Sequence, residues 1–486
     1  MRRIALLALS LLAALPACRP AGSQTPTAVP TTDAARPAAT LVGLTATLDR
    51  GSLPPDTTTR VVAQLRLDAG AIAPAARPPV DLALVIDTSG SMIGEPIAQA
   101  RDAAIAMLEG LRPGDRITVV TFDTRVQVLV APTVVGPQTS ANIATQLQQM
   151  QARGTTDLAA GLATALQQVA SAPLPGGAAR IVVLGDGVPN DASTIPQLVA
   201  QAAASNIAIS ALGLGLEYDE TLLAQLARGT GGRFHRIGED ETIAAAFRDE
   251  VFRIESVIAT NLVLQLHPGP GVTIARVVGY ASAPDTSRAH SVRLTDLSAG
   301  QHQDIFVELE VAGHAEGAPV ELLDAIASYD DRATNAGHLE QRTFVGAEAT
   351  VEHAHERNLE VERAAASARA AAATVEAIAQ SRIGDFAGAD TLLRDTETAV
   401  RAAAKETGDE ALTRSADELA GLRKTLAGER KRYEKALADA EREARRHGAG
   451  DGTRAPTPAP HATMPPSDRD EVRRVHDKAM DAMQPR

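Results

Sequence analysis

The chain has 486 residues, 44% hydrophobic and 22% charged, which supplies enough apolar side chains for one or more cores and excludes a wholly disordered protein. Its 60 acidic and 47 basic residues give a net charge of -13, the wrong sign for a protein that coats nucleic acid, so no nucleic-acid partner is expected. The single cysteine excludes a disulfide framework, a Cys-rich zinc site and a Cys-ligated iron–sulfur cluster.

The first residues have the pattern of a signal peptide. A basic pair precedes an apolar run, Ile4 to Leu15, that is too short for a comfortable membrane span. The run ends in Leu15-Pro16-Ala17-Cys18, which puts the only cysteine where a bacterial lipobox has its acylated residue. We therefore predict a lipoprotein signal peptide over residues 1–18, with lipid on Cys18 that anchors the protein to a membrane. A plain secretory peptide is the alternative.

The residues after the cysteine refine this prediction. Arg19 stands where an Asp would direct retention in the inner membrane, so the pattern favours the outer membrane of a Gram-negative bacterium and places the protein in the cell envelope. Residues 19–40 are mostly Pro, Thr, Ala and Ser. That composition cannot form a core, and it predicts a flexible linker.

The central part of the chain predicts an α/β domain inserted in a β-sandwich. Alternating apolar and polar residues in 41–78 and again in 258–348 predict strands that together form one sandwich. Residues 79–257 instead alternate short apolar strands with amphipathic helices, which is typical of a parallel sheet covered on both faces. The predicted strands are Leu82–Ile86, Ile117–Val120, Ile181–Leu184, Ile207–Leu212 and Arg233–Ile237. The predicted helices are Pro96–Leu111, Leu158–Ala170, Ile195–Ala204, Glu220–Ala227 and Glu241–Phe252.

The C-terminal part has a different composition. Residues 351–447 are rich in Ala, Glu, Arg and Leu, and breaks at 383–385 and 407–409 divide them into three predicted helices. A structural helical bundle or coiled coil is favoured over a dedicated docking arm. His353 and His355 are expected on a solvated helix surface. Residues 448–486 are predicted to be a disordered tail with at most one short helix around Asp470 to Met480.

Three polar segments follow or precede elements of the predicted parallel sheet. Asp87-Thr88-Ser89-Gly90-Ser91 follows its first strand, Gly154-Thr155-Thr156-Asp157 opens a helix, and Asp186 comes just after Ile181–Leu184. Ligands of open α/β sheets bind beyond the carboxyl ends of the strands, where these side chains should meet. Their oxygen atoms suit a hard cation. Each residue alone is also explained by helix capping, but the set of five is not.

This pattern resembles the metal-ion-dependent adhesion site of the von Willebrand factor type A family, Asp-x-Ser-x-Ser followed by Thr and Asp. Asp87, Ser89 and Ser91 match the first motif and Asp186 the last. Thr156 matches the threonine, because the family spaces it five residues before the small residue that is Gly161 here. The resemblance covers about residues 79 to 255, and Gly110 to Arg116 is most similar to the bacterial and inter-alpha-trypsin-inhibitor heavy-chain-like branch. Gly185 departs from the usual Ser or Thr without removing a ligand.

The resemblance implies a Rossmann-like α/β fold and a divalent metal, Mg²⁺ with Ca²⁺ or Mn²⁺ as alternatives. The hydroxyls of Ser89, Ser91 and Thr156 would bind the metal directly, while Asp87 and Asp186 would act largely through water. The implied partner is a protein that presents an Asp or Glu carboxylate. The sequence therefore predicts a membrane-anchored, metal-dependent binding protein.

Two other functions compete with this prediction. A metal-assisted hydrolase or phosphotransferase could use Asp87 as its nucleophile, but no second Asp stands two residues on and the chain has no phosphate-binding loop, so no enzyme is expected. In the second alternative the α/β domain is a structural spacer in an envelope complex, and the helical tail binds the partner.

Overall fold

The computed structural model describes residues 41–71, 79–171, 173–175, 177–185, 191–214, 219–237, 243–334, 336–446 and 464–486. The predicted signal peptide, the linker and the lipidation site Cys18 lie outside these residues. No helix within the described ranges combines the length and the apolar character needed to cross a membrane.

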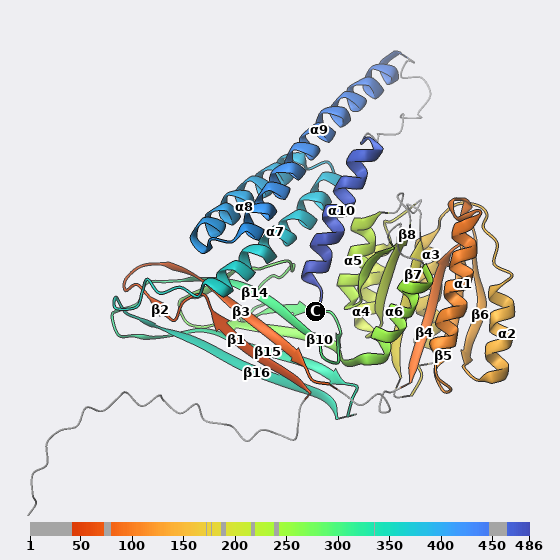
Figure 1. The fold of residues 1–486 in the computed structure, drawn as a ribbon, viewed down its shortest axis with the longest axis horizontal. Coiled ribbons are helices and arrows are strands. Elements are labelled where there is room, and N and C mark those ends of the chain that lie inside the picture. Colours follow the sequence, from red (N-terminus) through yellow and green to blue (C-terminus); the bar gives the residue numbers. More distant parts are fainter. Residues whose placement is uncertain are drawn as a thin grey trace, which may run out of the picture. The chain divides into compact units, whose positions relative to one another are not determined.

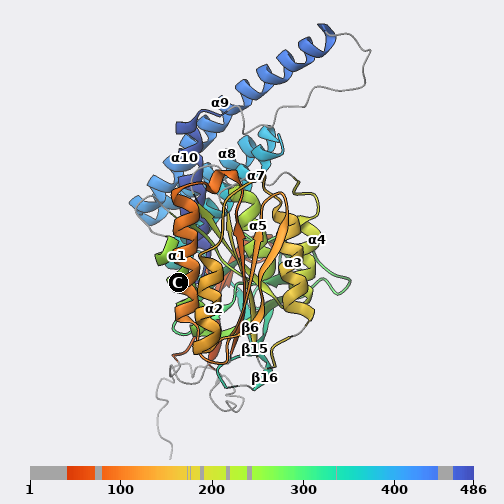
Figure 2. The ribbon, with the colours of Figure 1, turned by 90° about the vertical axis from the view of Figure 1, so that its right-hand side faces the viewer.

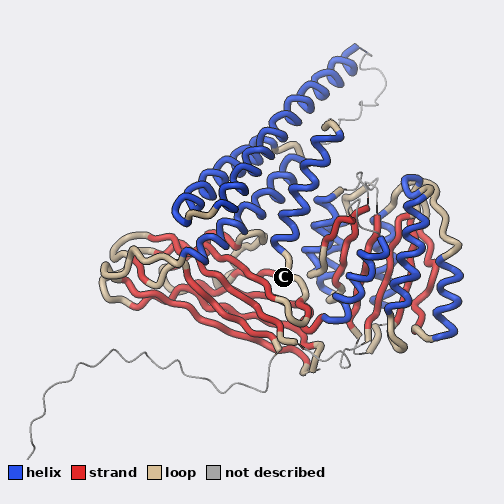
Figure 3. Tube along the Cα trace, in the orientation of Figure 1, coloured by secondary structure: helices blue, strands red, loops and turns tan. Residues whose placement is uncertain are grey.

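Two sheets, antiparallel except for the β16–β2 pair, form a sandwich from segments on both sides of the α/β domain (Figures 1 and 3). One sheet has the order β1-β3-β14-β11 and the other β12-β10-β15-β16-β2, with β13 paired to β10. The strands are β1 (Val42–Leu48), β2 (Ser52–Leu53), β3 (Thr59–Ala69), β10 (Val257–Pro268), β11 (Val272–Val277), β12 (His290–Arg293), β13 (Leu297–Ser298), β14 (His302–Val311), β15 (Pro319–Asp331) and β16 (Gly337–Ala349). Alternate residues such as Leu65, Leu264 and Tyr329 point into one shared core.

The α/β domain has a six-stranded sheet of order β6-β5-β4-β7-β8-β9, parallel except for β6. Its strands are β4 (Val80–Asp87), β5 (Arg116–Phe122), β6 (Val126–Val134), β7 (Ala178–Gly185), β8 (Ala208–Leu214) and β9 (Phe234–Ile237). Its helices are α1 (Glu95–Gly110), α2 (Pro137–Leu147), α3 (Leu158–Ser171), α4 (Ile195–Ala204), α5 (Glu220–Thr230) and α6 (Ile243–Ser256). The predicted fold class, an α/β domain of this type inserted in a β-sandwich and followed by helices, is confirmed.

Each face of the parallel sheet has its own core, because successive residues of a strand point to opposite sides. Leu82, Leu84 and Ile86 of β4 pack with α1, α2 and α6, whereas Ala83 and Val85 pack with α3, α4 and α5. Figure 2 shows α1 and α2 on one side of the strands and α3 and α4 on the other. This double cover explains why β4 is buried along its whole length, with Asp81 near its amino end paired to Arg116 and Asp87 at its carboxyl end.

Three long helices follow the sandwich: α7 (Leu359–Arg382), α8 (Phe386–Thr407) and α9 (Glu410–Arg446). The two helix breaks lie where the sequence predicts them. Leu412, Leu419 and Leu426 of α9 are buried at heptad spacing in a core shared with α7 and α8. His353 and His355 lie in turns before α7, not on a helix, because Asn358 caps α7 and so fixes its start.

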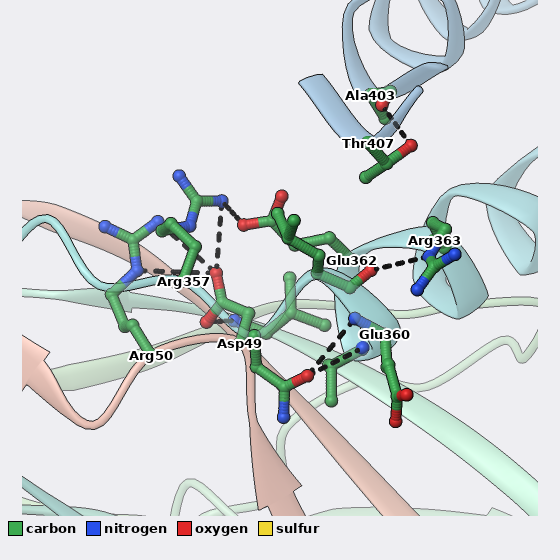
Figure 4. A network of polar contacts seen from close by, with 12 residues as sticks. Asp49, Arg50, Arg357, Glu360, Glu362, Arg363, Ala403 and Thr407 are labelled. Carbon is green, nitrogen blue, oxygen red and sulfur yellow. Dashed lines mark hydrogen bonds and ion pairs between the residues drawn. The ribbon is translucent and has the colours of Figure 1, made fainter. Parts of the chain in front are cut away.

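A polar network fixes the start of α7 on the sandwich (Figure 4). The carboxylate of Asp49, at the end of β1, accepts hydrogen bonds from Val62 N at 2.8 Å and Arg357 Nη2 at 3.5 Å. Arg357 also forms an ion pair with Glu362, whose pKa is raised by burial. The main-chain amide of Asn358 donates to the main-chain carbonyl of Asp49 at 2.7 Å. The buried Asp49 therefore binds both Val62 of the sandwich and Asn358, the residue that caps α7.

The prediction of a mostly disordered tail is wrong from residue 464 onward, although the short helix expected around Asp470 to Met480 lies within the observed helix. Pro466–Met483 form the 18-residue helix α10, whose buried face includes Val472, His476 and Met480. Met480 belongs to the core of the α/β domain, and the backbone of Arg486 exchanges two hydrogen bonds with His302 of β14, at 2.8 and 2.9 Å. The high charge content suggested disorder, but ion pairs such as Arg432–Asp468 and Arg236–Asp477 accommodate those charges against neighbouring elements.

Candidate functional site

The first predicted motif forms a compact loop at the carboxyl end of β4. Asp87 is the last residue of β4, with a side chain that is 0% exposed, and its carboxylate accepts the Ser89 amide at 2.7 Å. The hydroxyl oxygens of Ser89 and Ser91 lie 3.0 Å apart. Ser89 is buried and Ser91 is exposed. The loop therefore brings two hydroxyls together beside a buried carboxylate, at the edge of the sheet where the sequence places them.

Main-chain hydrogen bonds join the loop that contains Thr156 to this first loop. Gly90 N donates to Gly154 O at 3.0 Å, and Arg153 N donates to Thr88 O at 2.6 Å. Thr156, 9% exposed, lies two residues before α3 begins. Gly154 has a φ of +74°, and a Cβ there would lie 2.3 Å from Thr124 Oγ1, so this turn requires glycine. The structure thus brings the Thr156 loop to the loop of Asp87, Ser89 and Ser91.

The fifth predicted residue, Asp186, lies outside the described residues. The strand that precedes it, β7, ends at Gly185. This glycine lies next to Asp87, since a Cβ added to it would be 3.7 Å from Asp87 Oδ2. Four of the five predicted ligands therefore lie on two joined loops. Gly185, the residue before the fifth predicted ligand, lies beside Asp87 of the first loop.

Asp123 is a further site residue that the sequence reasoning missed. It follows β5, is buried, and its carboxylate binds the Arg125 amide at 2.8 Å and Arg153 Nε at 3.1 Å. Its carbonyl accepts the Asp157 amide at 3.2 Å. Asp123 thus holds the Thr156 loop on both sides of the threonine. A carboxylate directly after a buried strand was the available signal.

Close packing behind the site depends on Gly161 of α3. A Cβ at this position would lie 2.9 Å from the Phe122 ring, so α3 can approach β5 only with glycine here. We expect Gly161→Ala to lower the free energy of unfolding by about 1–3 kcal/mol through overpacking, as measured by urea denaturation. Gly421→Ala in α9 is the matched control, because a Cβ there meets nothing within 4 Å and should stabilise its helix by up to about 1 kcal/mol. Equal effects of the two changes would contradict this packing role.

The donor chemistry fits a small hard cation. Every predicted ligand offers oxygen, and the described ones combine one buried carboxylate with three hydroxyls on joined loops. Among the described residues, no group of three or more His, Cys, Asp or Glu side chains could hold a metal, so soft-metal sites find no support in this part of the chain. If a metal binds at this edge, hydroxyl ligands must supply much of its coordination.

Comparisons with known proteins agree with this architecture. The sequence profile of the family described as von Willebrand factor type A domain matches residues 80–236. The uncharacterized protein sll0103 of Synechocystis is 27% identical over 275 residues, which cover 54% of this chain and 64% of that protein. An inter-alpha-trypsin inhibitor heavy chain of Homo sapiens is 29% identical over 197 residues, 38% of this chain and 21% of that protein. The matches thus span less than two thirds of either relative.

A solved structure has the same fold over most of the chain. The structure described as von Willebrand factor type A from Catenulispora acidiphila aligns with a TM-score of 0.64 at 17% identity, covering 90% of this chain and 97% of that one. At this identity the likeness concerns the fold alone. Residues 80–236 thus match the von Willebrand factor type A profile, the fold is similar to that of a solved protein of this description, and the chain is distantly similar to sll0103 and to inter-alpha-trypsin inhibitor heavy chains.

Proposed function

We propose that the chain is a divalent-metal-dependent protein-binding lipoprotein of the cell envelope. Von Willebrand factor type A domains are typically protein-binding modules. The observation that carries the metal dependence is the pair of Ser89 and Ser91 hydroxyls, 3.0 Å apart beside the buried Asp87 carboxylate. The proposal assigns the chain no catalytic step.

Some residues around these hydroxyls are buried and hydrogen-bonded, and others are exposed to solvent. The buried Asp87 carboxylate orients the serine loop by accepting a hydrogen bond from the Ser89 amide, and the Asp123–Arg153 ion pair stabilises the neighbouring loop that contains Thr156. Ser91 faces solvent, and Ile93, two residues on, is 67% exposed. A bound Mg²⁺ would supply an open coordination position for a partner carboxylate. Ile93 then offers an apolar contact beside that carboxylate, so the preferred partner has an Asp or Glu next to a hydrophobic residue.

The membrane anchor in this proposal rests on the sequence. Lipid on Cys18 would tether the chain to the envelope, at the outer membrane of a Gram-negative bacterium, and residues 19–40 would separate the folded part from the bilayer. Mass spectrometry of the membrane-extracted protein tests this part separately. It should show a diacylated, N-acylated Cys18 as the first residue.

Partner capture tests the metal-dependent binding. The full chain is used to capture envelope proteins in Mg²⁺, in chelator, and as the variants Ser91→Ala and Ser140→Ala. Ser140 lies on α2, outside the three loops of the site, and serves as the matched control. We expect partners captured in Mg²⁺ by the wild type and by Ser140→Ala to be lost in chelator and in Ser91→Ala. Partners retained under all four conditions would contradict the proposal and direct attention to the helices.

A further inference from the structure

A cavity of about 840 Å³ lies where the α/β domain meets the sandwich and the C-terminal helices. Its walls come from α4 and α5, from the segment around Tyr280 after β11, and from α7 and α10. Helix α10 contacts both α5 and α7, as Figure 1 also shows. None of the four predicted metal ligands that the structure describes lines this cavity, and its volume is in the range of small-molecule binding sites.

One guanidinium in the cavity wall lacks an acidic partner. Arg228 of α5 lines the cavity, its CZ atom lies 5.6 Å from the centre of the Tyr280 ring, and burial lowers its pKa. Within the part of the chain that the structure describes, no carboxylate lies within ion-pair distance of Arg228. Arg228 is half-buried, and charges removed from water are normally paired, so its guanidinium is available to an anion in this cavity.

Two further polar groups in the wall are also unsatisfied. His476 of α10 is fully buried, and neither of its ring nitrogens has a hydrogen-bond partner among the described residues, although its Nδ1 lies 3.6 Å from the Asp477 carboxylate. The same holds for the buried hydroxyl of Thr221. Thr221 and Arg228 are seven residues apart on α5, two helical turns, so they share one face of that helix. Buried polar groups rarely lack hydrogen-bond partners, so the Thr221 hydroxyl and the His476 ring, in the same cavity wall as the Arg228 guanidinium, indicate a ligand.

The rest of the wall sets the class of that ligand. Ile195, Val199, Ala224, Ala372 and Val375 make one side of the cavity apolar. Among the described lining residues the one carboxylate is that of Glu376, which is exposed and accepts a hydrogen bond from Gln380 at 3.4 Å. The cavity is thus lined by a guanidinium and hydrogen-bond donors together with aliphatic side chains, which suits a ligand that has both an anionic and an apolar part.

We propose that this cavity binds a small amphiphilic anion, whose head group contacts Arg228 with Thr221 and His476 as further donors and whose apolar body packs on α4 and α7. Carboxylate and phosphate head groups share this chemistry. The inference does not depend on the proposed metal site, because the two sites share no residues.

Titration calorimetry of the full chain with octanoate, octyl phosphate and octylammonium tests the proposal. At least one of the two anions should bind saturably with one molecule per chain, and the stronger of them identifies the head group. Octylammonium should not bind. Arg228→Gln should weaken anion binding at least tenfold, whereas Arg248→Gln on α6, which does not line the cavity, should bind as the wild type does.

A second variant keeps the test decisive if Arg228→Gln is poorly folded. Val375→Phe on α7 places a ring in the cavity without removing any charge, and it should also abolish binding. Binding of neither anion to the wild type would overturn the proposal. Equal binding of octylammonium, or unchanged anion binding in both Arg228→Gln and Val375→Phe, would overturn it as well.

Discussion

Replacing Asp87 with alanine is expected to lower the affinity of the chain for Mg²⁺ by about 10–100-fold, the usual effect of losing a carboxylate that orients metal ligands. The carboxylate is fully buried and accepts the Ser89 amide, so its loss both removes negative charge and frees the loop that positions the two serine hydroxyls. Titration calorimetry of the full chain with Mg²⁺ measures the effect.

Asp157→Asn is the matched control for this change. Asp157 is exposed, directly follows Thr156, and its carboxylate accepts the Ala160 amide at 3.1 Å. Asparagine can make the same capping bond, so the variant loses one charge near the site but keeps the loop. It should bind Mg²⁺ nearly as the wild type does. An equal loss in both variants would mean that general negative charge, and not the Asp87 loop, determines metal affinity.

Replacing Arg180 with methionine is expected to cost about 3–5 kcal/mol of folding free energy at neutral pH. Arg180 of β7 forms a buried ion pair with Asp296, which lies between β12 and β13 of the sandwich. Asp296 also accepts the Asn261 amide at 3.2 Å. Without Arg180, the Asp296 carboxylate would be buried without its ion-pair partner.

The pH dependence of this loss has a definite sign. Burial raises the pKa of Asp296 in the folded protein, and Arg180 opposes that rise. Without Arg180 the folded pKa rises further, so stability is lost as pH increases from about 4, the pKa of an unfolded aspartate, through the folded value. Urea denaturation should therefore show a small deficit at low pH and a large one at pH 7.

An exposed ion pair provides the comparison for Arg180. Arg342 pairs with Asp324 on the sandwich surface, with its Nε 2.8 Å from Asp324 Oδ1 and a side chain that is 69% exposed. Arg342→Met should change the free energy of unfolding by less than about 1 kcal/mol. The Arg180–Asp296 pair joins β7 of the α/β domain to the sandwich. If Arg180→Met had a similarly small effect, or one that does not vary with pH, this pair would not stabilise that junction.

The sequence predicts much of this fold because its strongest periodic patterns are long and buried. Strands such as Leu82–Ile86 read as continuous apolar runs, and Leu412, Leu419 and Leu426 mark the seam of α9. Strand β6 and helix α2 were not predicted. β6 is mostly exposed, pairs antiparallel to β5 and lacks a buried run, and α2 buries only Ile143 and Leu147.

The site was predictable to the extent that its chemistry is local. Asp87, Ser89 and Ser91 lie within five residues, and the expected convergence of strand ends correctly places the Thr156 loop beside them. Asp123 was missed because its role depends on contacts with Arg153 and Asp157 that no spacing reveals. A short helix around Asp470 to Met480 was predicted, but the full length of α10 and its packing were missed, because its buried face includes the polar residues Arg473 and His476.

Anomalous diffraction from a crystal of the full chain soaked in Mn²⁺ tests the central claim most directly. We expect one peak at the carboxyl end of β4, about 2.1–2.3 Å from the hydroxyl oxygens of Ser89 and Ser91, with Thr156 and Asp186 beside it. Such a peak would also show whether Asp186 contacts the metal or its water. A peak only elsewhere on the chain, or none at Mn²⁺ concentrations well above the calorimetric affinity, would contradict the metal-dependent binding site.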